Sequence, residues 1–507
     1  MACSQLHVVL CCIPAYGHTK PLIIFAEHLA EAGHEVTYAT SKTMVPHCKN
    51  ICRDPRVNML ALDDGLVPES ENFMLGRPDH VKTHPVWFAE EKMTPPLVAA
   101  IKSMSRPPDL VISDHLTWAG SNAARAHGLK HACHVTWPLH MLEEAGLLPA
   151  RSLARSAEIH LRAVRSCRLA PACVHPPGPP RAMLERVRLH CLGGDGGCCG
   201  GLVFVTSCFG IEPSRAIPPF IRVIGRGHRP ETVQALDEHP ELKARITQRM
   251  KSEETCHKHH DVVYVTFGSR VPPPASLVRS VGEGLLAGGW AVVWSLKEAQ
   301  QAYLPDAAVT SAKFFVKSWL PQAPALAHPN IRAAITHCGM GGLFECAANA
   351  LPVIPLPFLL SADQPVNARA AEAAGFAVRP RPSRSAGWWR KFFRAGGDPD
   401  YTANAIREAV SRAVNDPMLL EGARRAKRAV LATGYGRGAV DAVESICLHG
   451  TDYLTAGATE RGKTSSSCRT PPAFMIGVAV GAAFAAAMGR ILFSAGSRAG
   501  IVGGVHV

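Results

Sequence analysis

The residues whose chemistry is easiest to read lie between Trp319 and Gln364. Trp319 offers a flat face on which a base can stack, and His337 precedes a glycine-rich turn, Gly339-Met340-Gly341-Gly342. Glycines allow the backbone to approach a ligand closely, and the N–H groups at a helix start favour an anion such as a diphosphate. Glu345 follows within one turn, where a carboxylate can accept both hydroxyls of a ribose. The segment therefore predicts a nucleotide-sugar site.

Other side chains extend this site. His337 follows a buried strand expected from Ile331 to Thr336, and we expect it to donate a charge-assisted hydrogen bond to a phosphate oxygen. Asp363 and Gln364 are expected to bind the hydroxyls of a hexose. A second turn, Gly268-Ser269, follows an expected strand, and the Ser269 hydroxyl could face the diphosphate. A plain turn after a strand is the alternative there.

A histidine near the amino terminus has the position of a proton acceptor. Leu6 to Ile13 is a continuous apolar run, a tight turn follows, and an amphipathic helix pattern then begins. His18 lies at the start of that helix, where open α/β sheets bind ligands. The helix dipole disfavours the imidazolium, so we expect a neutral ring that can accept a proton.

Together these segments resemble the UDP-dependent glycosyltransferases, the family that includes plant secondary-product glucosyltransferases and animal UDP-glucuronosyltransferases. The Gly17-His18-x-x-Pro21 pattern resembles the family's catalytic histidine site, and Asp114 in the run DLVISDHLTW fits its partner aspartate. Further along, the Trp-x-Pro-Gln opening, the His-Cys-Gly core, the glutamate and the closing Asp-Gln follow the family's order. The implied donor-binding residues are Ser269, Trp319, Leu320, Gln322, His337, Gly339, Gly341, Gly342, Glu345, Asp363 and Gln364.

The resemblance implies an inverting transfer of a hexose from a UDP-sugar, UDP-glucose first, to a hydroxyl of a small acceptor. His18 would take the proton of the acceptor hydroxyl, which attacks the anomeric carbon in line as UDP leaves. Asp114 would orient the imidazole and stabilise its charged form. The UDP-sugar is a substrate in this scheme, and no cofactor or metal is expected.

The chain departs from the family's pattern at the glycine-rich turn. Plant members usually read His-Cys-Gly-Trp-Asn-Ser, whereas this chain has Met340-Gly341-Gly342 after the His-Cys-Gly. A lost hydroxyl-to-phosphate hydrogen bond costs roughly 1.5–3 kcal/mol, on the order of tenfold or more in donor affinity. The segment between Glu345 and Asp363 is also about two residues longer than the pattern. A homologue that binds nucleotide or acceptor without turnover is therefore the alternative to an enzyme.

The elements around these residues predict two doubly wound Rossmann-like domains facing a cleft, which the family calls the GT-B fold. A chain of 507 residues exceeds the size at which one core stops growing. We expect an acceptor-binding domain at 1–225, with its last strand in Gly201 to Pro213, and a linker at 226–260. A UDP-sugar-binding domain at 261–450 and a polar tail at 451–507 complete the expected organisation.

The net charge of +13 is unevenly distributed. Arg151 to His190 carries eight arginines, and Arg379 to Arg394 combines six basic residues with four aromatic ones. Such mixtures suit single-stranded nucleic acid or a membrane surface, and solvated insertions are the alternative. No nucleic-acid motif accompanies them, so no nucleic-acid partner is expected. The chain has 17 cysteines and no recognisable signal peptide, which favours reduced thiols. Neither Cys191-Cys198-Cys199 nor the cluster from Cys256 to His260 has zinc-finger spacing, so neither is expected to bind metal.

The carboxyl-terminal tail contains an uncharged stretch from Ala473 to Gly489, followed by apolar residues up to Phe493. This length is near the lower limit for a membrane-spanning helix. We expect a membrane anchor at 473–493, with both domains on the cytosolic side and a lipophilic acceptor within reach. A loose amphipathic tail on a cytoplasmic protein is the alternative.

Overall fold

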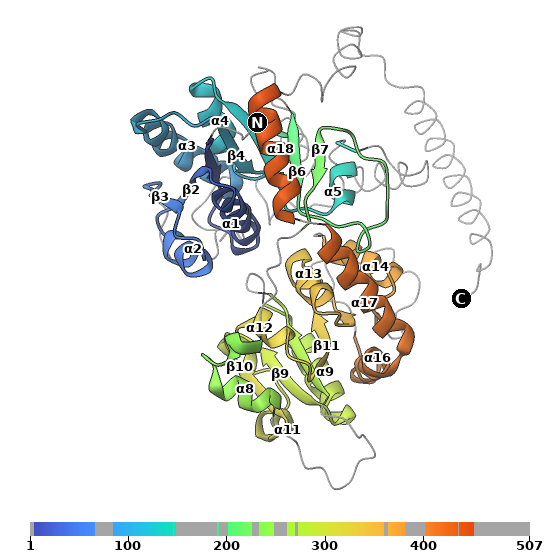
Figure 1. Cartoon of the computed structure of the whole chain (residues 1–507). Helices are drawn as coiled ribbons and strands as arrows, with labels where there is room; N and C mark the ends of the chain where they lie inside the picture. The colour runs from blue at the N-terminus through green and yellow to red at the C-terminus, as the bar shows by residue number, and fades with distance from the viewer. Residues whose placement is uncertain are drawn as a thin grey trace, which may run out of the picture.

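The computed structural model describes residues 5–65, 85–144, 147–148, 190–191, 201–225, 233–247, 261–268, 272–358, 363–380, 401–433 and 435–450. Within these ranges the chain forms two parallel sheets, each covered by helices in its own domain (Figure 1). The prediction of two doubly wound Rossmann-like domains is confirmed.

The amino-terminal domain is built on a seven-stranded sheet with the order β3-β2-β1-β4-β5-β6-β7. The strand order reverses between β1 and β4, and ligands of such sheets bind outside the carboxyl ends of the strands at that point. The strands are β1 (His7–Cys11), β2 (Glu35–Ser41), β3 (Val57–Leu62), β4 (Leu110–Asp114), β5 (Lys130–Val135), β6 (Leu202–Val205) and β7 (Ile221–Val223). The helices before β6 are α1 (Tyr16–Glu31), α2 (Val45–Ile51), α3 (Pro85–Ser103), α4 (Trp118–Ala126) and α5 (Leu139–Glu144).

Strand β1 shows why the apolar runs of this domain become central strands. Its alternate side chains enter two different cores: Val9 and Cys11 pack in one, and Val8 and Leu10 in the other. A strand that is buried on both faces needs a continuous apolar run instead of an alternating one. Strand β4 is buried in the same way, with Val111 in the first core and Leu110 and Ile112 in the second.

The carboxyl-terminal domain has a five-stranded sheet with the order β10-β9-β8-β11-β12, and its order reverses between β8 and β11. Its strands are β8 (Val262–Thr266), β9 (Ala291–Ser295), β10 (Phe314–Lys317), β11 (Ile331–Thr336) and β12 (Val353–Pro355). The helices around it are α9 (Ala275–Gly288), α10 (Glu298–Gln301), α11 (Asp306–Thr310), α12 (Gln322–Leu326), α13 (Met340–Ala348), α14 (Gln364–Ala373), α16 (Ala403–Asn415) and α17 (Pro417–Ala432).

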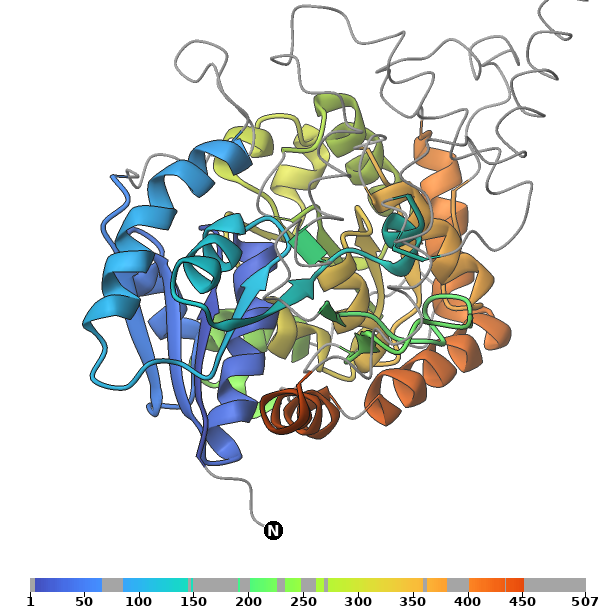
Figure 2. The same cartoon turned by 90° about the horizontal axis from the view of Figure 1, so that it is seen from above.

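The last described helix, α18 (Tyr435–His449), returns to the amino-terminal domain (Figure 1). Its buried stripe of Ala439, Val440, Val443 and Ile446 joins the core beneath α1. Figure 2 shows α18 end-on, in dark red, beside the blue helices of that domain. The expected boundary at residue 450 therefore differs from the structure, because the apolar face of α18 is covered by α1 instead of by the carboxyl-terminal domain.

Two further expectations also differ from the structure. The first domain does not end its sheet with the strand in Gly201 to Pro213, because β7 pairs in parallel with β6 and forms the edge. The expected linker contains a 3-10 helix, η3 (Val233–Leu236), and α8 (Pro240–Thr247). Leu236, Leu242 and Ile246 are buried in the core of the carboxyl-terminal domain, so this largely polar segment packs against that domain through its few apolar residues.

Several expectations concern residues outside the described ranges. They are Ser269, the insertion at 359–362, most of the two basic stretches, the cysteine and histidine clusters at 198–199 and 256–260, and the tail from 451 onward. Among the helices that the structure describes, none is both long and apolar enough to cross a membrane. The anchor expected at 473–493 stays a prediction.

Candidate active site

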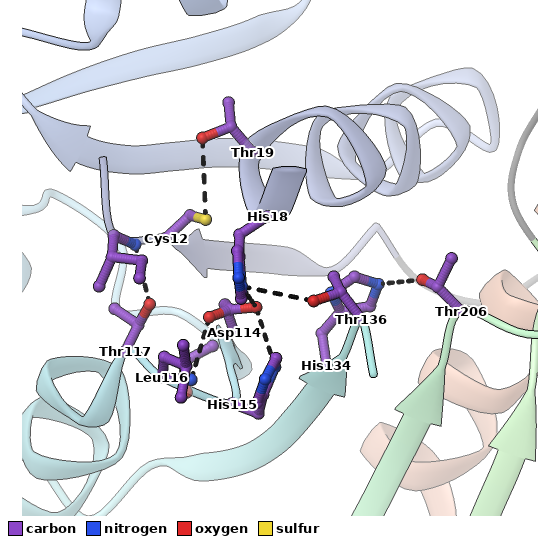
Figure 3. A network of polar contacts seen from close by, with 12 residues as sticks. Cys12, His18, Thr19, Asp114, His115, Leu116, Thr117, His134, Thr136 and Thr206 are labelled. Carbon is purple, nitrogen blue, oxygen red and sulfur yellow. Dashed lines mark hydrogen bonds and ion pairs between the residues drawn. The ribbon is translucent and has the colours of Figure 1, made fainter. Parts of the chain in front are cut away.

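The two residues expected to share a proton meet at the carboxyl ends of β1 and β4. Nδ1 of His18 lies 2.8 Å from Oδ2 of Asp114 (Figure 3). The aspartate side chain is completely buried, whereas 9% of the histidine side chain is exposed. A buried anionic carboxylate can only accept, so Nδ1 of His18 carries the ring proton and Nε2 keeps its lone pair. The imidazole is therefore oriented as a base.

The carboxylate of Asp114 is held by several neighbours. Its Oδ1 accepts a hydrogen bond of 3.0 Å from the backbone N–H of Leu116, and its Oδ2 lies 3.2 Å from Nδ1 of His115 (Figure 3). Burial raises the pKa of this carboxyl, but the neighbouring His18 and His115 outweigh burial and hold the pKa of Asp114 well below its usual range. The group is ionised at neutral pH and can stabilise a positive charge on His18.

Two neighbours of this pair were not singled out from the sequence. The buried ring of His115 stacks on His18, with 5.1 Å between ring centroids and 28° between planes. Burial lowers the pKa of His115, so this ring is neutral at pH 7. The Thr136 hydroxyl lies 3.4 Å from Nδ1 of His18 (Figure 3). The only sequence signal for His115 was its adjacency to Asp114.

The expected diphosphate site lies between β11 and α13. Strand β11 covers the expected Ile331 to Thr336, and α13 begins at Met340 with Gly339 as its cap residue and no capping side chain. Cys338 between them has a φ of 64°, a left-handed conformation that costs a non-glycine residue about 1–2 kcal/mol. Strain of this kind gathers where a backbone must take one particular shape for a ligand.

The ring of His337 lies between two glycines. A Cβ at Gly268 would lie 2.8 Å from its Cε1, and a Cβ at Gly339 would lie 2.6 Å from its Nε2, so a side chain at either position would force the ring to move. Burial lowers the pKa of His337 to about 4. Burial by itself thus favours the neutral ring, which offers an ordinary N–H donor, and the charge-assisted hydrogen bond to a phosphate stays a prediction.

Glu345 links the two domains. Its Oε1 accepts a hydrogen bond of 3.0 Å from Nζ of Lys20, and its Oε2 accepts one of 2.6 Å from Nε2 of Gln322. Lys20 belongs to α1 and lies two residues after His18. This contact, which the sequence did not indicate, brings the first turn of α1 against the expected ribose-binding carboxylate. The expected proton acceptor and the expected nucleotide-binding segment thus lie close together.

Trp319 and Leu320 begin the donor segment, the stretch from Trp319 to Gln364 that resembles the family's donor site, and they have different surroundings. Trp319 is 68% exposed, so its indole is not a core aromatic and has a face available for stacking. The ring of His239 lies 6.0 Å from it, tilted by 58°. Leu320 is instead buried in the core of the carboxyl-terminal domain. Only the backbone of Leu320 could therefore contact a nucleotide, because core packing holds its side chain.

The Asp363-Gln364 pair begins α14. Oδ2 of Asp363 accepts a hydrogen bond of 2.7 Å from Nδ2 of Asn367, which also donates to the carbonyl of Cys338 at 3.0 Å. Asn367, missed in the sequence, thus ties Asp363 to the strained turn before α13. Gln364 is buried, and its Oε1 accepts a hydrogen bond from the backbone N–H of Phe358 at 3.3 Å. In this structure that oxygen braces the backbone at Phe358.

Gly342 offers a test of the divergent turn. A Cβ at this position would lie 3.6 Å from Oγ1 of Thr336 and 3.8 Å from Nε2 of Gln322, which is ordinary contact distance. Gly342→Ser is therefore expected to be accommodated and to tighten UDP-sugar binding by on the order of tenfold, because it restores a hydroxyl donor. Calorimetric titration would measure the change. Gly339→Ser, which would collide with His337, should weaken binding; weaker binding in a folded Gly342→Ser protein would contradict the hypothesis.

The chain is similar in sequence to known proteins. Residues 235–383 match the family model described as UDP-glucoronosyl and UDP-glucosyl transferase. The chain is 36% identical over 117 residues to anthocyanidin 3-O-glucosyltransferase of Vitis vinifera. The matched segment covers 23% of this chain and 25% of that protein. It is 30% identical over 229 residues to indole-3-acetate beta-glucosyltransferase of Zea mays, covering 42% and 45%. The matched segments thus span between a quarter and just under half of these relatives.

Solved structures show the same fold over most of the chain. Os79 from O. sativa in complex with UDP has a TM-score of 0.60 at 19% identity, covering 86% of this chain and 100% of that one. A structure of Os79 in complex with U2F and trichothecene has a TM-score of 0.64 at 19% identity, covering 87% and 100%. The resemblance and the fold class inferred from the sequence are confirmed.

Proposed function

We propose that this member of the UDP-glycosyltransferase family transfers a hexose from a UDP-sugar, with UDP-glucose as the first candidate, to a hydroxyl of a small acceptor. The observation that carries the proposal is the contact between Lys20 and Glu345. Lys20 follows His18 by two residues on α1, so this contact brings His18 close to the segment that resembles the donor site. A histidine-aspartate pair far from that segment would have no bearing on sugar transfer.

The proposed reaction begins with the acceptor hydroxyl near Nε2 of His18. Nε2 accepts the hydroxyl proton while the oxygen attacks the anomeric carbon, and the bond from that carbon to the UDP oxygen breaks. Attack in line with the leaving group inverts the anomeric configuration. The imidazolium that forms keeps its Nδ1 proton on Asp114, whose ionised carboxylate stabilises the charge.

The UDP-sugar would bind on the side of the site that the carboxyl-terminal domain forms. We propose that the base stacks on Trp319, the ribose hydroxyls donate to Glu345, and the diphosphate lies at the start of α13 beside His337. A bound diphosphate favours the charged form of His337, because the anion offsets the burial that lowers its pKa. No protein metal ligand is needed in this scheme, since helix N–H groups and the histidine supply the positive potential.

Turnover assays with purified protein test the proposal directly. UDP release would be measured with UDP-glucose, UDP-galactose and UDP-glucuronic acid against an acceptor panel. The panel includes an anthocyanidin, indole-3-acetate and a trichothecene, which the relatives' names suggest, together with a sterol for the lipophilic class. Acceptor-dependent UDP release, with the glycoside identified by mass spectrometry, is the expected result. UDP binding without release for any pair would instead favour the non-catalytic homologue.

The cross-domain ion pair gives a separate prediction about donor affinity. Nζ of Lys20 lies 3.0 Å from Oε1 of Glu345, so a ribose hydroxyl that binds this oxygen must share or displace that contact. The lysine side chain is 38% exposed, and such pairs contribute up to about 1 kcal/mol. Lys20→Met is therefore expected to tighten UDP binding by up to about fivefold.

Calorimetry at low and high salt would measure this effect, which salt should reduce because it screens the pair. Lys42→Met is a matched control, because Lys42 pairs with Asp63 at the surface of the same domain. If Lys20→Met weakens UDP binding while Lys42→Met does not, then Lys20 binds the nucleotide itself.

A further inference from the structure

Around His18 lie more nitrogen and oxygen atoms of the kind that bind metals than proton transfer requires. His18, Asp114 and His115 are all buried, and one nitrogen or carboxylate oxygen from each lies within 4.8 Å of the others. Both imidazoles direct Nδ1 toward the same carboxylate oxygen, at 2.8 Å and 3.2 Å. Among the described residues, Nδ1 of His115 has the Asp114 carboxylate as its ion-pair partner, and its Nε2 has no hydrogen-bond partner. Two buried imidazoles that share one carboxylate oxygen form a set of donor atoms that proton transfer by His18 alone does not require.

The spacing is close to that of a metal site. Zinc binds histidine nitrogen and carboxylate oxygen at about 2.0–2.2 Å, so ligands in a tetrahedral arrangement are separated by about 3.3 Å. The contacts to Asp114 Oδ2 are 2.8 Å from His18 and 3.2 Å from His115, so the His18 ring would have to move outward by about 0.5 Å and the His115 ring by about 0.1 Å to admit the ion. The His18 side chain is 9% exposed and that of Asp114 is fully buried, so an ion would enter from the His18 side.

We propose that His18, Asp114 and His115 form a binding site for a zinc-like divalent cation, and that the bound cation inhibits sugar transfer. Imidazole and carboxylate suit zinc and its neighbours in the transition series better than magnesium or calcium, which prefer oxygen ligands. The ion would not be a cofactor. It would bind Nδ1 of His18 and Oδ2 of Asp114, the two atoms whose hydrogen bond keeps the ring proton on Nδ1.

The inhibition follows from the position of one proton. In the metal-free protein Nδ1 of His18 donates to Asp114, and Nε2 holds the lone pair that accepts the acceptor's proton. A cation bound to Nδ1 needs the lone pair at that atom, so the neutral ring must carry its proton on Nε2. No proton is gained or lost in this exchange. The ring that results can no longer accept a proton at the atom facing the acceptor.

The contacts around the cluster also suit a cation. Oδ1 of Asp114 accepts from the backbone N–H of Leu116 at 3.0 Å, which leaves Oδ2 as the oxygen that both histidines face. The neighbouring His134 has its Nε2 on the Thr206 hydroxyl at 2.9 Å. Thr136 faces the same region with a hydroxyl.

Binding of Zn²⁺ to the full-length, untagged protein without UDP-sugar is the first test. Competition with a chromophoric chelator would count the sites in the wild type, in His115→Phe and in His47→Phe. His115→Phe keeps a ring in the space and should weaken one site by at least about tenfold. His47, a half-buried histidine on α2, is a matched control, and His47→Phe should retain that site.

Asp114→Asn provides a second variant in case His115→Phe does not fold, and it should weaken the same site. Co²⁺ absorption spectra would show the loss of a histidine and carboxylate environment in either variant. Equal numbers and affinities of Zn²⁺ in the wild type and in both folded variants would overturn the site.

The inhibitory part rests on the proposed function and has its own readout. Zn²⁺ should reduce acceptor-dependent UDP release in the wild type, and a chelator should restore it. The Zn²⁺ concentration that halves turnover should be at least about tenfold higher for His115→Phe than for the wild type. Zinc that binds at the cluster without reducing turnover would overturn the inhibition, whereas a wild type without turnover would overturn the proposed function and leave the binding result standing.

Discussion

His18→Ala is expected to lower turnover by roughly 100-fold or more while leaving UDP affinity nearly unchanged. The imidazole is the group oriented to accept the acceptor's proton, with Nδ1 held at 2.8 Å by a buried carboxylate. Its removal leaves the donor-segment residues in place, because none of the described hydrogen bonds of Glu345 or His337 involves His18. Steady-state kinetics and calorimetry with UDP would measure the two quantities separately.

The control for this experiment lies on the same helix. His28→Ala also removes an imidazole from α1, but His28 pairs with Glu31 at the surface, away from Asp114. It should retain turnover, so an equal loss in both variants would indicate damage to α1. Unaltered turnover in a folded His18→Ala protein would remove the proposed mechanism.

Asp114→Asn is expected to lower turnover by roughly 100- to 10,000-fold with little change in the Michaelis constant for the UDP-sugar. An amide cannot stabilise the imidazolium that forms on His18. An amide N–H placed opposite Nδ1 also favours the tautomer with its proton on Nε2, which cannot act as the base. Because Oδ1 would still accept from Leu116, the turn after β4 should keep its shape.

Asp109→Asn is the matched comparison at the other end of the same strand. Asp109 likewise accepts a hydrogen bond from a backbone N–H, that of His7 at 2.8 Å. It precedes β4, however, and lies at the amino-terminal end of that strand, opposite the end at which Asp114 contacts His18. Its substitution should affect stability at most. A folded Asp114→Asn protein with the turnover of the wild type would show that Asp114 serves only to cap the turn.

The sequence by itself determined the features that depend on neighbouring residues. Strand β11 matches its expected bounds, because an apolar run followed by glycines specifies a buried strand and a tight turn within about fifteen residues. His18 follows β1 and Asp114 ends β4 for the same local reason. Parallel strands place their carboxyl ends at one edge of a sheet, so the meeting of these two residues across 96 positions could be expected from the fold class.

The tertiary structure alone decided the contacts that join segments without a shared local pattern. Lys20 and Glu345 are 325 residues apart and in different domains, and no periodicity of either helix indicates that they meet. The neutral state of His337 and the burial of Leu320 depend on how densely other segments pack around them. The same holds for α18, whose apolar stripe is equally suited to either domain until the chain path brings it against α1. Local patterns specify which faces must be buried, whereas only packing selects the partner that buries them.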